Sequence, residues 1–191
     1  MTPHLVIYGD FNCPYSCLAS YRADRLVAAG AAEIEWRAVE HDPSISVPSN
    51  AAVGDLGAML DREVAEVRSL LQPGEVFPIE RPTVQPNTAR AVAAYAAAGV
   101  TDRNRLRHSL FAALWFEGLD TGDLDVLQRL GAEPTEAVSP LVSTWRGAWL
   151  HLDRYLVPML VLPDGYVSRG LGALARLADL AATAASPSGE A

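Results

Sequence analysis

Strand-like segments lie near both ends of the 191-residue chain, and helical patterns fill the region between them. The apolar or alternating stretches that predict strands are residues 4–8, 33–39, 156–162 and 166–168. Apolar residues at helical spacing predict one helix over 16–29, between the first two strands, and another over 171–184, after the last. The order is therefore β-α-β, a long helical region, then β-β-α. Strands so far apart in the chain must share one sheet to bury their apolar faces.

The middle of the chain predicts a helical insertion. Helix start and stop signals bound segments at residues 56–71, 87–98, 102–117, 123–130 and 135–152, the last with Pro140 able to delay its start. Residues 41–50 and 75–86 are proline-rich and predict loops. We therefore expect a discontinuous domain made of residues 1–50 and 154–191, with residues 51–153 as the insertion, and a frayed tail over 186–191.

Both cysteines lie in one five-residue stretch, Cys13-Pro14-Tyr15-Ser16-Cys17, between the first strand and the first helix. Pro14 suits the first helical turn because its missing N–H costs no hydrogen bond there. The free N–H groups and the positive dipole end of a helix start stabilise a thiolate, which is the nucleophilic form of cysteine. Cys13 is therefore the candidate nucleophile.

Composition excludes several other functions. A net charge of −8 and the lack of a basic run argue against a nucleic-acid partner. No apolar stretch is long enough to span a membrane, and the chain starts without a signal-peptide pattern, so we expect a cytoplasmic protein. The four histidines show no ligand spacing, so we expect no metal site. In that compartment a close cysteine pair favours catalytic or redox chemistry over a structural disulfide.

Four segments together resemble the DsbA-like thioredoxin-fold family, in its cytosolic branch near the polyketide-associated dithiol–disulfide isomerases. They are Asp10-Phe11-Asn12-Cys13-Pro14-Tyr15, residues 86–90, residues 110–118, and Val157-Pro158 followed by a hairpin and Gly170. The resemblance implies an α/β thioredoxin fold with a large all-helical insertion. It also implies that Cys13 is an exposed nucleophile, that Pro158 is a cis-proline lying against it, and that the backbone of Val157 pairs with substrate.

The stretch departs from the Cys-Pro-aromatic-Cys motif of that family, because Ser16 stands in the fourth position and the second cysteine is Cys17. In a straight helix, residues four apart have Cα atoms about 6 Å apart, near the upper end of the range that a disulfide spans. A Cys13–Cys17 disulfide would therefore be strained and easily reduced. Cys17 either resolves a mixed disulfide or packs in the core. Ser16 either hydrogen-bonds the thiolate or caps the helix, and Tyr15 is expected to cover the thiol.

The same stretch also resembles kappa-class glutathione transferases and 2-hydroxychromene-2-carboxylate isomerases, which carry serine at the Cys13 position. Their acidic residue after the last strand has no counterpart in residues 167–170. Glu40, His41 and Asp42 follow the second strand and would border the site. We expect three tryptophans to pack in the core of the insertion, with one of them able to line a cleft that faces Cys13. They are Trp115, Trp145 and Trp149.

The leading hypothesis is a thiol–disulfide oxidoreductase or isomerase with catalytic Cys13 and Cys17. Its substrate contacts would come from Pro14, Tyr15, Ser16, Val157 and Pro158. One alternative is a glutathione-dependent transferase or isomerase acting on a small aromatic or polyketide-like substrate. Another is a non-catalytic binding module on the same fold. We expect no tightly bound cofactor, with glutathione as a possible co-substrate. The expected partner is a disulfide-containing protein or a small-molecule thiol, and we expect neither a nucleic-acid nor a membrane partner. A homodimer is possible.

Overall fold

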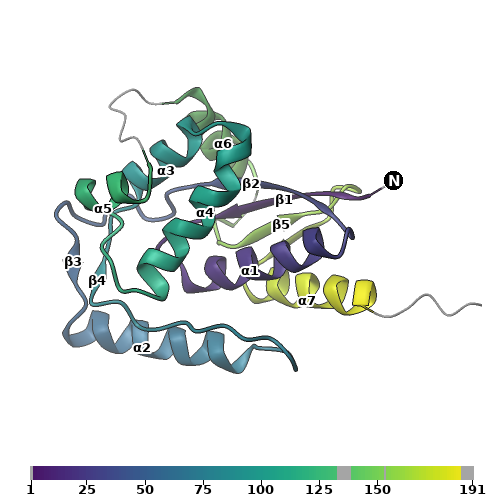
Figure 1. Ribbon diagram of the computed structural model, residues 1–191, viewed down its shortest axis with the longest axis horizontal. Coiled ribbons are helices and arrows are strands. Elements are labelled where there is room, and N and C mark those ends of the chain that lie inside the picture. Colours follow the sequence, from purple (N-terminus) through teal and green to yellow (C-terminus); the bar gives the residue numbers. More distant parts are fainter. Residues whose placement is uncertain (1, 133–138, 153, 186–191) are drawn as a thin grey trace, which may run out of the picture.

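The computed structural model describes residues 2–132, 139–152 and 154–185 (Figure 1). The tail expected to fray, residues 186–191, lies outside this part of the chain, as do residues 135–138 of the last insertion helix. The described part of the insertion includes α5 (Leu124–Arg129) and α6 (Pro140–Leu150). α6 begins at Pro140, with Ser139 as its N-cap.

A four-stranded mixed sheet joins the two ends of the chain, as predicted. Its strands are β1 (His4–Gly9), β2 (Glu33–Ala38), β5 (Met159–Val161) and β6 (Val167–Arg169), in the order β2-β1-β5-β6. β1 pairs in parallel with β2, whereas the β1–β5 and β5–β6 pairs are antiparallel. Tyr8 of β1 is opposite Met159 of β5, so the end of β1 lies beside the start of β5. This register decides which loops meet at the site.

Two helices from opposite ends of the chain, α1 (Pro14–Ala28) and α7 (Leu171–Ala185), run side by side (Figure 1). The guanidinium of Arg22 on α1 is buried between them and the segment after α2 (Gly54–Ser69). It donates to the Leu174 carbonyl at 2.9 Å, to the Leu70 carbonyl at 2.6 Å and to Glu75 at 2.8 Å. A buried arginine is tolerated because these acceptors and the Glu75 carboxylate compensate its charge.

The helices α3 (Ala89–Ala97), α4 (Val100–Trp115) and α6 gather at the β2 side of the sheet. Trp36 of β2 packs edge-on against Phe111 of α4, with ring centroids 5.6 Å apart. Gly9, which ends β1, lies beneath the Trp36 ring, and a Cβ atom there would come within 2.3 Å of it. Glycine is therefore needed at the last position of β1, immediately before the cysteine-bearing loop.

Three details differ from the sequence expectations. The insertion is not wholly helical, since β3 (Asn50–Ala51) and β4 (Val84–Gln85) pair as a short antiparallel ribbon. α4 begins at Val100 rather than Asp102, because Gly99 is the N-cap and Asp102 belongs to the first turn, where its charge favours the helix dipole. β5 begins at Met159, three residues later than predicted, because Pro158 has no N–H to donate to a strand ladder.

Candidate active site

Cys13 is the N-cap residue of α1, at the point where the chain leaves β1 and turns into the helix. Its Sγ accepts a hydrogen bond from the backbone N–H of Ser16 at 3.4 Å, as an N-cap side chain does. Pro14 occupies the first helical position, as expected from its missing N–H. The Cys13 side chain is half-buried, so part of it faces solvent.

The opposite wall of the site is the Val157-Pro158 bond, which is cis. The Cys13 thiol donates to the carbonyl of Val157, with 3.8 Å between Sγ and O. This contact follows from the sheet, because β5 lies next to β1 and its first residue is opposite Tyr8. The structure thus brings Cys13, Val157 and Pro158 together.

The electrostatic setting of Cys13 differs from the sequence expectation of a stabilised thiolate. Burial raises the pKa of Cys13 to about 12, and the negative charges of Asp10 and Glu63 act in the same direction. The hydrogen bonds from Ser16 oppose this increase without cancelling it. Desolvation therefore outweighs the Ser16 hydrogen bonds, and the balance favours the neutral thiol.

Cys17 lies one turn further along α1 and faces the core. Its side chain is 2 % exposed, and burial raises its pKa well above the ordinary value. Both cysteines are free. The Cys17 N–H donates to the Cys13 carbonyl at 3.1 Å, which shows that the first helical turn is regular. A regular turn offers no distortion that would bring the two sulfurs into easy bonding range.

Of the three residues between the cysteines, Ser16 points into the core and Tyr15 points toward the insertion. Ser16 is fully buried; its N–H binds Sγ of Cys13, while its hydroxyl accepts from the Asp10 N–H at 3.3 Å. Tyr15 reaches α2, where its hydroxyl donates to Glu66 at 2.5 Å. Ser16 is thus tied to the thiol by its backbone, and Tyr15 bridges the thiol loop to the insertion.

A buried carboxylate beneath the site was missed by sequence reasoning. Asp10 is fully buried and accepts from Thr88 Oγ1 at 2.7 Å, from the His41 N–H at 2.7 Å and from the Asn12 N–H at 3.3 Å. Burial raises its pKa, while these donors act against the increase. Asp10 therefore joins the end of β1 to the loop after β2 and to the start of α3. Of the residues expected to border the site, His41 does so through its backbone.

Two insertion tryptophans fix the walls of the site. The indole N–H of Trp115 donates to the Phe11 carbonyl at 2.9 Å, and that of Trp149 donates to the Leu156 carbonyl at 3.4 Å. Phe11 precedes Cys13 by two residues, and Leu156 directly precedes Val157. Both tryptophan side chains are buried, as expected for insertion core. Buried indoles usually find an acceptor, and these two acceptors lie in the site loops.

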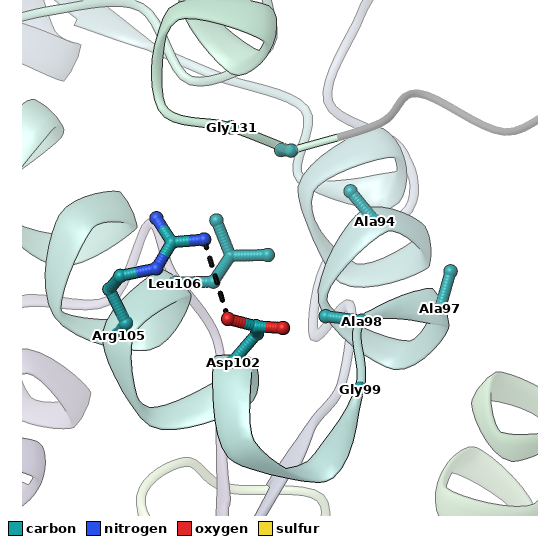
Figure 2. A pocket seen from close by; sticks show the side chains of 9 residues that line it. Ala94, Ala97, Ala98, Gly99, Asp102, Arg105, Leu106 and Gly131 are labelled. Atoms are coloured by element: carbon teal, nitrogen blue, oxygen red, sulfur yellow. Dashed lines mark ion pairs between the residues drawn. The ribbon is translucent and has the colours of Figure 1, made fainter.

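A cavity of about 270 Å³ opens elsewhere, between α3, α4 and Gly131 (Figure 2). Its charged side chains, Asp102 and Arg105, face each other as an ion pair at 3.8 Å. Its remaining lining consists of alanines, glycines and Leu106, and it includes neither cysteine nor Val157. We assign this cavity no part in thiol chemistry.

A half-buried cysteine at the start of the helix after β1 faces a cis-prolyl bond at the start of the neighbouring strand β5. Together with the β2-β1-β5-β6 sheet, this arrangement defines a thioredoxin-fold thiol site. The sequence model described as DSBA-like thioredoxin domain matches residues 4–143, and the chain belongs to this family. The match extends from β1 through most of the insertion. A comparison with curated proteins gave no match.

Solved structures show the same fold at low sequence identity. A 2-hydroxychromene-2-carboxylate isomerase is 21 % identical to this chain, with a TM-score of 0.68. The alignment covers 96 % of this chain and 100 % of the isomerase chain. A probable DsbA oxidoreductase from Streptomyces coelicolor is 14 % identical with a TM-score of 0.68, covering 95 % and 89 %. The cytosolic disulfide reductase DsbM from Pseudomonas aeruginosa, solved with GSH, is 16 % identical with a TM-score of 0.67, covering 94 % and 96 %.

Proposed function

We propose that this protein is a thiol–disulfide oxidoreductase that works through one cysteine, Cys13, with an external thiol completing the cycle. The observation that carries the proposal is the position of Cys13, a half-buried residue whose Sγ is 3.8 Å from the carbonyl that precedes the cis-proline. An incoming disulfide can lie along the Val157 backbone with one sulfur next to Sγ. Cys17, buried and unbridged, is left out of this proposal.

The exchange proceeds in two steps. The Cys13 thiolate attacks one sulfur of a substrate disulfide, an S–S bond forms to Cys13, and the other substrate sulfur leaves as a thiolate that takes up a proton. An external thiolate then attacks the substrate's sulfur in the mixed disulfide. This second attack releases Cys13 and leaves the external thiol oxidised as a new disulfide with the substrate. A second external thiolate then attacks the external sulfur of that disulfide, so both substrate sulfurs end as thiols and the two external thiols end joined as one disulfide. The substrate gains the two electrons that the two external thiols lose.

The raised pKa of Cys13 determines the rate of disulfide exchange that we expect at neutral pH. At pH 7 a thiol of pKa about 12 is ionised in about one molecule in 10⁵. Exchange by the resting protein is therefore slow at neutral pH, unless a bound substrate displaces the Val157 contact and offers the sulfur a better environment.

Glutathione is the external thiol that we propose, and the cytoplasm is the compartment. The support for both is the fold shared with DsbM, a cytosolic disulfide reductase solved with GSH. In the described part of the chain, none of the helices combines the length and apolar character needed to cross a bilayer. A homodimer remains a prediction from the sequence.

The test is the reduction of 2-hydroxyethyl disulfide by glutathione, measured for the unmodified protein, Cys13→Ser and Cys17→Ser. We expect Cys13→Ser to fall to the uncatalysed rate and Cys17→Ser to keep most of the activity. Equal rates for the unmodified protein and Cys13→Ser would refute the proposal. The matched serine substitution at Cys17 controls for the loss of a buried sulfur.

A second function is favoured by one feature of the site, a neutral Cys13 thiol that donates a hydrogen bond. In a glutathione-dependent transferase or isomerase, this thiol would hydrogen-bond a glutathione thiolate instead of attacking a disulfide. A serine hydroxyl can make the same bond, so Cys13→Ser would then keep both saturable glutathione binding and activity. The same variant thus separates the two functions. A binding module without turnover would show neither activity.

A further inference from the structure

One side of the proposed site is formed by two glutamates of α2. Tyr15, two residues after Cys13, is bonded to Glu66. Glu63 lies three residues earlier on the same helix, and residues at this spacing share a helix face. Glu63 is half-buried, whereas Glu66 is exposed. Glu63 acts electrostatically on the Cys13 thiol and Glu66 contacts Tyr15, so both carboxylates lie on the α2 side of the cysteine-bearing loop.

The charges in this region are coupled to the thiol. The negative charge of Glu63 contributes to the raised pKa of Cys13, and Glu66 and Glu63 both raise the pKa of Tyr15. Burial raises the pKa of Glu63 itself, and Glu66 adds to that increase. The basic groups that act against it are His41, after β2, and Arg62 on α2. We call Glu63 and Glu66 the acidic rim.

Two exposed apolar side chains lie next to the Val157 wall of the site. Tyr155 and Leu156 directly precede Val157, and their side chains are 56 % and 50 % exposed. Large apolar side chains this exposed, next to a reactive group, are typical of a contact surface for a ligand. Tyr155 is held in place by the ring of Trp149, with centroids 5.7 Å apart. A substrate at Cys13 thus meets an apolar lip on one side and carboxylates on the other.

We propose that the acidic rim makes this site selective for disulfides that carry a positive charge a few bonds from the sulfur. This inference rests on the proposed function, because it concerns the substrate that Cys13 attacks. A cationic group on the leaving or the attached thiol would lie near Glu63 and Glu66, and its aliphatic part would contact Tyr155 and Leu156. An anionic disulfide would instead meet two like charges, which lowers both its approach rate and its binding.

The experiment uses three small disulfides of similar size: cystamine, which is cationic, 2-hydroxyethyl disulfide, which is neutral, and dithiodiglycolate, which is anionic. The rate constant for forming the mixed disulfide at Cys13 is measured by intact mass for each reagent, and each value is divided by that of a free small thiol. This division removes the intrinsic reactivity of the reagents. Cys13→Ser provides the blank for all three.

We expect the normalised rates to fall from the cationic to the anionic reagent. Glu63→Gln and Glu66→Gln should each reduce the cationic-to-anionic ratio by about three- to tenfold. The amide introduced by Glu66→Gln keeps an acceptor for the Tyr15 hydroxyl. Glu33→Gln is the matched control, since Glu33 is exposed at the opposite end of β2 and should leave the ratio unchanged. For the unmodified protein, the ratio should also shrink as salt is added, because solvent-facing charges are screened.

The outcomes separate this inference from the proposed function. A Cys13-dependent reaction with all three reagents, at equal normalised rates that neither glutamate variant changes, would overturn the selectivity and leave the oxidoreductase proposal standing. Reaction with none of them would overturn the proposed function. The salt dependence of the unmodified protein requires no variant, so it decides the question even where a substitution disturbs folding.

Discussion

At the scale of single residues, the proposed nucleophile, Cys13, lies in surroundings that favour its protonated form. The helix start and the Ser16 N–H favour the thiolate, but burial and the nearby carboxylates favour the thiol, and the net effect is a pKa of about 12. The Val157 carbonyl adds an acceptor for the thiol proton. On the proposed function, Cys13 is therefore a thiol whose activation depends on pH or on substrate.

This electrostatic balance predicts a steep pH profile for the free protein. Because a raised pKa leaves the thiolate scarce throughout the neutral range, alkylation of Cys13 by iodoacetamide should rise about tenfold per pH unit with no plateau below about pH 10. The measurement is the labelling rate in Cys17→Ser, which leaves one thiol in the chain. A plateau near neutral pH would show that the thiolate is stabilised after all.

At the scale of secondary-structure elements, Asp10 fixes how β1, the loop after β2 and the start of α3 meet. Thr88 begins α3 as its N-cap, yet its side chain makes no capping bond and its hydroxyl donates to Asp10 instead. The backbone of His41 donates to the other carboxylate oxygen. The single buried carboxylate of Asp10 thus supplies the hydrogen-bond acceptors that hold these three segments together.

Asp10→Asn tests this arrangement. The Asp10 carboxylate accepts hydrogen bonds from three donors, on Asn12, His41 and Thr88. The NH₂ group of an asparagine would face one of these donors, and because neither group can accept, a buried donor would be left unpaired. We expect a loss of about 1–3 kcal/mol in the free energy of unfolding, measured by urea denaturation.

Thr88→Val provides the control for that measurement, because it keeps the shape of the side chain and removes one donor, leaving the other two bonds of Asp10 in place. Its loss should be smaller than that of Asp10→Asn. Equal unfolding free energies for Asp10→Asn and the unmodified protein would show that the network contributes nothing to stability.

Sequence patterns were sufficient for the order of the sheet strands and main helices, but not for the β3–β4 ribbon or for what surrounds the thiol. Periodicity identified the strands of both ends, and the Cys13-Pro14 pair located the start of α1. The resemblance to the family supplied the cis bond before Pro158, which the structure confirms. By contrast, the contacts of Asp10, Trp115 and Glu66 join segments distant in the chain, and no local pattern marks them. The pKa of Cys13 depends on the same long-range burial, which the position of the cysteine at a helix start does not reveal.

At the scale of the whole molecule, the insertion holds the site together as much as the sheet does. Trp115 and Trp149 bind the two site loops, Thr88 supports the loop before Cys13, and Glu66 holds Tyr15. The division into residues 1–50 with 154–191 and residues 51–153 stays a prediction about chain order. Its two parts share the site, because the sheet supplies Cys13 and Val157 while the insertion supplies the acidic rim.

The central claim, that Cys13 exchanges disulfides without Cys17, is tested most directly by trapping the intermediate. The protein is exposed briefly to 2-hydroxyethyl disulfide, quenched with acid and mapped by mass spectrometry, and glutathione is then added to a second sample. We predict a mixed disulfide on Cys13, unmodified Cys17, and release of Cys13 by glutathione. Loss of two hydrogens from the protein, with Cys13 and Cys17 joined and no adduct, would contradict this account.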